Sequence, residues 1–99
     1  MLADIDVQAT WYTPGLGSCG ETDSESDLVV ALATASMSGG KNCNKSINIT
    51  DIKTGKSATA RVRDTCPSCA SGDLDMSPFL FQKFWSLDVG VFRMKWNFE

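Results

Sequence analysis

The sequence contains no histidine, and it has four cysteines, at Cys19, Cys43, Cys66 and Cys69. Mixed Cys/His zinc sites are therefore excluded, and the cysteines lack the repeated CxxC spacing of a four-thiolate zinc site. An even number of cysteines in a short chain instead predicts disulfides, which persist in oxidising compartments; four cysteines allow three connectivities, and spacing alone does not choose among them. We therefore expect a secreted, disulfide-containing protein with no metal ion and no cofactor.

Long apolar runs and clusters of positive charge are also missing. No apolar run reaches the roughly 18 residues that a membrane-spanning helix needs. The densest basic group is the pair Arg61 and Arg63, and the net charge is -3. Neither a membrane nor a nucleic acid is therefore an expected partner, whereas a neutral polymer makes no such demand on charge.

The first residues show no export signal, since they lack both a basic end and an apolar stretch. We expect that a signal peptide has been removed and that Met1 is left over from recombinant expression. Two N-x-S/T sequons, at Asn44 and Asn48, are compatible with a secreted eukaryotic chain, although such tripeptides are common by chance.

The chain has 99 residues, enough for one domain, because single cores usually occupy roughly 50 to 200 residues. Short alternating or apolar runs between turn signals predict a mainly β structure for the single domain 1–99. The expected strands lie at 9–13, 28–32, 47–52, 58–63 and 92–98. The third and fourth read as a hairpin, and the second has the continuous apolar character of a buried strand.

One segment is expected to be helical. Ser77 is a good N-cap, Pro78 suits the first helical position, and apolar residues then recur at helical spacing as far as Leu87. Gly90 follows, before the last strand.

Two aspartates are candidates for chemistry. Alternation along 58–63 carries Val62 to the inner face, and the next position in that series is Asp64, a carboxylate that needs an open barrel mouth or a partner. Asp75 precedes the expected helix, whose N-terminal turn would favour its ionised form, while a nearby Asp64 would oppose it. The pair has the chemistry of a general acid and base, but a locally bonded Asp64 and a capping Asp75 are the structural alternatives.

The segment Cys66-Pro67-Ser68-Cys69 has the spacing of a redox CxxC motif, in which a helix N-terminus lowers the thiol pKa. No such helix follows directly here. A local disulfide that shapes the site between Asp64 and Asp75 is therefore favoured over a redox centre.

Aromatic rings can form stacking platforms for sugars, because an aromatic face offers apolar area with defined geometry. Alternation turns Trp96 inward, and Trp85 lies on the apolar stripe of the helix, so both are expected in the core. Trp11 and Tyr12 occupy opposite faces of one strand, which leaves one of them as a candidate for exposure.

Several segments together match a known group of proteins. They are Ala9-Thr10-Trp11-Tyr12, Gly17-Ser18-Cys19-Gly20, Asn42-Cys43, Val62-Arg63-Asp64, Cys66-Pro67-Ser68-Cys69 and Gly72-Asp73-Leu74-Asp75-Met76-Ser77-Pro78-Phe79. In these segments the chain resembles fungal loosenins, single-domain expansin-like proteins that are related to barwin and to bacterial rare lipoprotein A. The resemblance covers nearly the whole chain and is most specific around Asp75.

This resemblance implies a six-stranded double-psi β-barrel with one or two short helices, stapled by disulfides, and with a polysaccharide groove across one side. The family's essential aspartate matches Asp75, and a second groove aspartate matches Asp64. Its groove threonine matches Thr13 or Thr10, with Thr13 favoured. The candidate polysaccharide-binding residues, all in or just after the first strand, are Thr10, Trp11, Tyr12 and Thr13. The family pattern also pairs Cys19 with Cys43 and Cys66 with Cys69.

The resemblance further implies that the protein binds and loosens cellulose or chitin without cutting it. Related inverting endoglucanases take their base from the first strand, which here ends Tyr12-Thr13-Pro14, and inversion needs both an acid and a base. Weak inverting hydrolysis with Asp64 as the base is one alternative. Peptidoglycan cleavage is not expected, because the relatives that perform it use a histidine.

A protein-binding module, such as a cysteine-protease inhibitor or a defence protein, is the alternative from a different class, in which the acidic loop 21–27 would matter more than the groove. We also expect a monomer without the second, carbohydrate-binding domain that plant expansins carry, and therefore a modest affinity for polymer.

Overall fold

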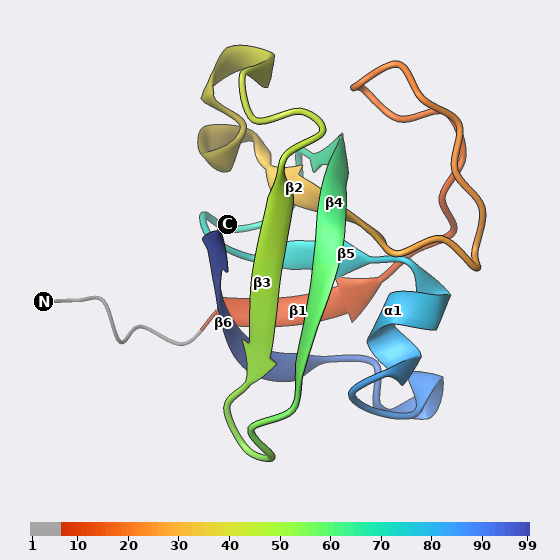
Figure 1. Cartoon of the computed structure of the whole chain (residues 1–99), viewed down its shortest axis with the longest axis vertical. Coiled ribbons are helices and arrows are strands. Elements are labelled where there is room, and N and C mark those ends of the chain that lie inside the picture. The colour runs from red at the N-terminus through yellow and green to blue at the C-terminus, as the bar shows by residue number, and fades with distance from the viewer. Residues whose placement is uncertain (1–6) are drawn as a thin grey trace, which may run out of the picture.

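In the computed structural model, which describes residues 7–99, the alternating segments close into one β-barrel (Figure 1). Its strands are β1 (Val7–Trp11), β2 (Val29–Ala33), β3 (Ser46–Asp51), β4 (Ser57–Cys66), β5 (Leu74–Met76) and β6 (Phe92–Phe98). Around the barrel their order is β1-β5-β2-β4-β3-β6. The expected mainly β, six-stranded architecture is confirmed, while the expectations about Met1 and a signal peptide concern residues outside those described.

The pairing of the strands is mixed. β1 and β5 run parallel, as do β2 and β4, whereas the remaining neighbours around the barrel are antiparallel. A parallel pair cannot be joined by a tight turn and requires a longer connection. Strand β5 was not among the expected strands, because three residues are too few to show a period.

The interior of the barrel is filled by the apolar residues that alternate along the strands. The larger ones with no exposed surface are Val30, Leu32, Ile47, Ile49, Val62, Leu74, Met76 and Met94. Burying a side chain of this size is worth about 1.5–3 kcal/mol relative to leaving it exposed. All five residues of β2 are buried, as its continuous apolar run predicted.

Helix α1 (Pro78–Gln82) begins where the sequence predicted, with the Ser77 hydroxyl accepting a hydrogen bond from the Leu80 amide. It is shorter than expected: it ends at Gln82, and Ser86 then caps a separate 3-10 turn, η4 (Leu87–Val89). Two further 3-10 turns, η2 (Thr34–Ser36) and η3 (Ser38–Gly40), follow β2.

Two disulfides join Cys19 to Cys43 and Cys66 to Cys69, the pairing that the resemblance implied. The tryptophan expected inside the barrel, Trp96, is partly buried and packs against the core, where its indole N–H donates to the Gly72 carbonyl. Within residues 7–99, no helix has the length and apolar character to cross a membrane.

Candidate functional site

A row of four residues crosses neighbouring strands on the outer face of the barrel. In register, Thr10 of β1 lies beside Asp75 of β5, Asp75 beside Ala31 of β2, and Ala31 beside Asp64 of β4. The residues on either side of Asp75, Leu74 and Met76, point into the core, so Asp75 points outward. We call Thr10, Asp75, Ala31 and Asp64 the acid row.

The position of Asp64 corrects the expectation from alternation. Val62 pairs with Val30 and Asp64 pairs with Ala31, so β4 contains one extra residue, Arg63, at this point. Such a β-bulge reverses the alternation beyond it. Asp64 therefore lies on the opposite face from Val62 and faces outward, on the same side as Asp75.

The bulge is stabilised by the loop that follows β1. The Arg63 carbonyl accepts a hydrogen bond from the Cys19 amide at 3.2 Å. Gly17 lies against the same carbonyl, and a Cβ atom at Gly17 would be 2.3 Å from the oxygen. A side chain at position 17 would therefore displace the segment that turns Asp64 outward.

Asp75 combines partial burial with few hydrogen bonds. Its Oδ1 accepts a bond from the Thr10 hydroxyl at 2.9 Å, the only hydrogen bond of its side chain within residues 7–99. Burial raises the pKa of the Asp75 carboxyl above its ordinary value; the Thr10 bond lowers it, and the charge of Asp64 raises it further. Burial thus has the largest effect on this pKa, and the opposition from Asp64 that the sequence predicted adds to the upward shift.

Asp64 is engaged by the backbone. Its Oδ1 accepts hydrogen bonds from the amides of Ser18 and Thr65, each at 2.8 Å. The Ser18 hydroxyl also lies 2.7 Å from that of Thr65. One oxygen of Asp64 therefore anchors the loop after β1, and the locally bonded interpretation of this residue fits its geometry.

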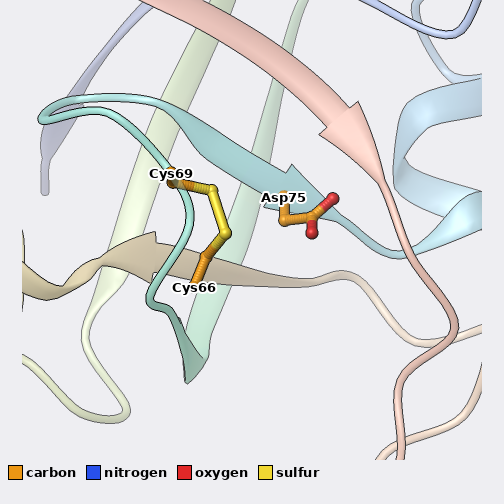
Figure 2. A group of neighbouring side chains, drawn as sticks. All are labelled: Cys66, Cys69 and Asp75. Carbon is orange, nitrogen blue, oxygen red and sulfur yellow. A yellow bond between two sulfur atoms is a disulfide. The ribbon is translucent and has the colours of Figure 1, made fainter.

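A hollow of about 350 Å³ opens beside Asp75. Its lining comes from β1, the end of β4, β5 and the loop between β4 and β5: Gln8, Thr10, Cys66, Ser68, Cys69, Ala70, Asp73 and Asp75. Figure 2 shows the disulfide and the Asp75 carboxylate together, and ligand atoms of Cys66, Cys69 and Asp75 lie within 4.8 Å of one another. Because the two sulfurs are bonded to each other, they offer no thiolate to a metal ion.

The remaining candidates for sugar binding do not all reach the acid row. Tyr12 lies within electrostatic reach of Asp64 and Asp75: burial raises the pKa of its phenol, and both charges add to the shift. Trp11 pairs with Met76, on the opposite side of β1 from Thr10, and its indole N–H donates to the Leu87 carbonyl.

Thr13, favoured as the groove threonine, lies exposed beyond the end of β1 and makes no side-chain hydrogen bond in the part of the chain that the structure describes. It is Thr10 that contacts Asp75. The alternation of β1 also places Gln8 on the side of Thr10, a residue that the sequence analysis did not consider although the period of two could have identified it.

Comparison with known proteins begins with two relatives by sequence, since no model of a protein family matches the chain. The chain is 32% identical over 109 aligned positions to the papain inhibitor of Streptomyces mobaraensis, covering 97% of this chain and 76% of the inhibitor. It is 37% identical over 81 positions to the allergen Asp f 7 homolog of Arthroderma benhamiae, covering 77% of this chain and 27% of that protein. The chain thus spans about a quarter of the allergen homologue.

Solved structures agree on the fold. An expansin of Clavibacter michiganensis, solved as a mutant with cellohexaose, superposes with a TM-score of 0.84 at 22% identity, covering 95% of this chain and 49% of the expansin. The chain therefore spans about half the length of that expansin. The Streptomyces papain inhibitor superposes with a TM-score of 0.80 at 29% identity, covering 95% of this chain and 92% of the inhibitor. The chain belongs to the family of the Streptomyces papain inhibitor and has the double-psi β-barrel fold of expansins.

Proposed function

We propose that the protein binds a linear cell-wall polysaccharide, such as cellulose or chitin, along the acid row and loosens it without hydrolysis, as loosenins do. The acid row carries this proposal. It aligns a carboxyl group whose pKa is raised, a threonine hydroxyl and a second carboxylate on one outer face, with the hollow beside Asp75. Secretion, which the two disulfides favour, would bring this face to such a polymer.

The arrangement supplies directional hydrogen bonds to a sugar chain. A protonated Asp75 can donate to a sugar oxygen, and an ionised one can accept from a sugar hydroxyl. Tyr12 adds an aromatic ring near the carboxylates of Asp64 and Asp75.

Two features argue against efficient hydrolysis. Inversion requires a base that activates water opposite the acid, but Oδ1 of Asp64 already accepts two backbone hydrogen bonds. The first strand contributes Thr10, which is no general base at neutral pH.

A relative of the same fold supports a sugar ligand. The Clavibacter expansin is described in complex with cellohexaose. At 22% identity this likeness shows the fold alone. The proposal of a sugar ligand for this protein therefore depends on the acid row.

The test is to incubate cellulose and chitin with wild type and with Asp75→Asn. Mechanical weakening of the polymer and soluble reducing ends are measured together. Asp88→Asn is the matched control, because it removes one exposed carboxylate from η4, away from the acid row. We expect weakening without sugar release, lost in Asp75→Asn and kept in Asp88→Asn; steady sugar release that depends on Asp75 would instead identify a hydrolase.

We propose inhibition of a papain-like cysteine protease as the second candidate function. The observation that favours it is the relationship to the Streptomyces papain inhibitor, which extends over nearly the whole chain. Stoichiometric inhibition of papain by wild type and equally by Asp75→Asn would support a protein partner at a surface other than the acid row. An inability of the wild type to inhibit papain would reject this candidate.

A further inference from the structure

The long connection between β1 and β2 contains a small hairpin, residues 15–23. Leu16 forms an antiparallel bridge with Thr22, and the Asp23 amide donates to the Gly15 carbonyl at 3.1 Å. In Figure 1 this connection is the orange excursion that reaches away from the barrel. We call residues 15–23 the Leu16 hairpin.

The Leu16 hairpin is held to the barrel by its turn. The Ser18 amide donates to Asp64, and Cys19 is bonded covalently to Cys43, in the segment before β3. A disulfide and a charge-assisted hydrogen bond at adjacent residues fix the backbone strongly.

The returning arm of the Leu16 hairpin has its own attachment. Asp23 forms an ion pair with the Nε of Arg63 at 3.4 Å, and the same arginine donates from Nη1 to Asn44 at 2.7 Å. Both arms are therefore fixed before any partner arrives, which lowers the entropy lost on binding.

Leu16 is the most exposed of the large apolar side chains in the part of the chain that the structure describes, at 75%. A single exposed leucine needs no explanation by itself. The Leu16 hairpin differs from an ordinary exposed leucine, because the loop that presents the side chain to solvent is rigidly attached to the barrel. Apolar side chains of this kind serve as anchors when they fill a pocket on a partner.

We propose that the Leu16 hairpin is the surface that docks into the substrate cleft of a papain-like protease, with Leu16 in an apolar subsite. The proposal rests on the inhibitory function proposed above. Clefts that bind substrates are concave and largely apolar, so they match a protruding leucine better than they match the charged acid row. Among the described residues, Asp75 makes no hydrogen bond to the hairpin, so we expect inhibition to survive Asp75→Asn.

The experiment measures the inhibition constant for papain with wild type, Leu16→Ala, Leu16→Met and Ile52→Ala. Ile52 is the matched control, since it is apolar, 46% exposed and lies beside the β3–β4 turn. Loss of a buried leucine side chain corresponds to about 10- to 100-fold weaker binding. We expect that loss in Leu16→Ala. Leu16→Met should keep most of the affinity, and Ile52→Ala should leave the inhibition constant unchanged. Unchanged melting temperatures confirm that each variant is folded.

A second arm locates the contact on the protease. Calorimetry compares free papain with papain whose cleft is filled by a covalently attached peptide-like blocker. We expect binding to free papain alone. Equal inhibition by wild type and Leu16→Ala, or equal binding to blocked papain, would overturn the hairpin proposal while leaving the inhibitory function standing. Absence of inhibition by wild type would reject both.

Discussion

Two aspartates in different regions of the barrel have opposite relations to their surroundings. Asp51, at the end of β3, is 1% exposed, and its two oxygens accept hydrogen bonds from the amides of Lys53 and Thr54 and from the Thr54 hydroxyl. Asp75, in the acid row, is more exposed but accepts a single side-chain hydrogen bond, from Thr10. The more deeply buried carboxylate is thus the better satisfied one.

The contrast teaches that burial alone does not identify a functional carboxylate. An ionised carboxylate has about four acceptor positions, and filling them compensates the loss of water. At Asp51 the donors come from the tight turn that joins β3 to β4, so its charge stabilises the fold. At Asp75 much of the acceptor capacity stays unused and faces an open hollow, so a ligand can use it.

The largest expected effect comes from replacing each of the two aspartates, Asp51 and Asp75, with asparagine. Asp51→Asn replaces one accepting oxygen with an amide group that faces N–H or O–H donors, so we expect a loss of about 2–3 kcal/mol in the free energy of unfolding. Asp75→Asn keeps an oxygen for Thr10 and should cost nothing at neutral pH. Urea unfolding of both variants measures this, and equal losses would remove the distinction between the two sites.

A smaller loss of stability is expected at Asp64, whose side chain accepts two hydrogen bonds, fewer than Asp51 and more than Asp75. Asp64→Ala leaves the Ser18 and Thr65 amides without their acceptor, so we expect a loss of about 1–2 kcal/mol. Asp64→Asn retains one accepting oxygen and should lose less than about 1 kcal/mol. Urea unfolding compares the variants, and faster hydrogen exchange at the Ser18 amide in Asp64→Ala should locate the change; similar stability of both variants would show that the anchor is unimportant.

Much of this fold could be predicted from periodicity, because a strand with one solvent-exposed face alternates apolar and polar residues. The alternation at 92–98 became β6, and the apolar run ending at Leu32 became the buried strand β2. The start of α1 was readable because Ser77 and Pro78 act locally. The length of that helix was not, because α1 already ends at Gln82 although apolar residues continue at helical spacing as far as Leu87.

The candidate site was harder to foresee, because it depends on register between strands distant in sequence. Asp64 and Asp75 were identified, but the inward orientation of Asp64 was wrong, since a bulge at Arg63 has no signature in a single strand. The contact of Thr10 with Asp75 likewise joins residues 65 positions apart. Asp51 escaped notice altogether, because its donors become apparent only once the turn is formed.

The smallest expected effect is a pH dependence that separates Asp75 from an ordinary surface carboxylate. Its pKa is raised in the folded protein, so folding favours the protonated form. The stability that protonated Asp75 contributes is fully present below the unfolded pKa of about 3.9, and it is lost as pH rises through the folded pKa. Asp75→Asn has no such group to ionise. The difference in melting temperature between Asp75→Asn and wild type should therefore be larger in favour of the variant at pH 7 than at pH 3. A difference that is constant with pH would mean that Asp75 ionises as freely in the barrel as in the unfolded chain, and the acid row would then lack the raised pKa on which its proposed function draws.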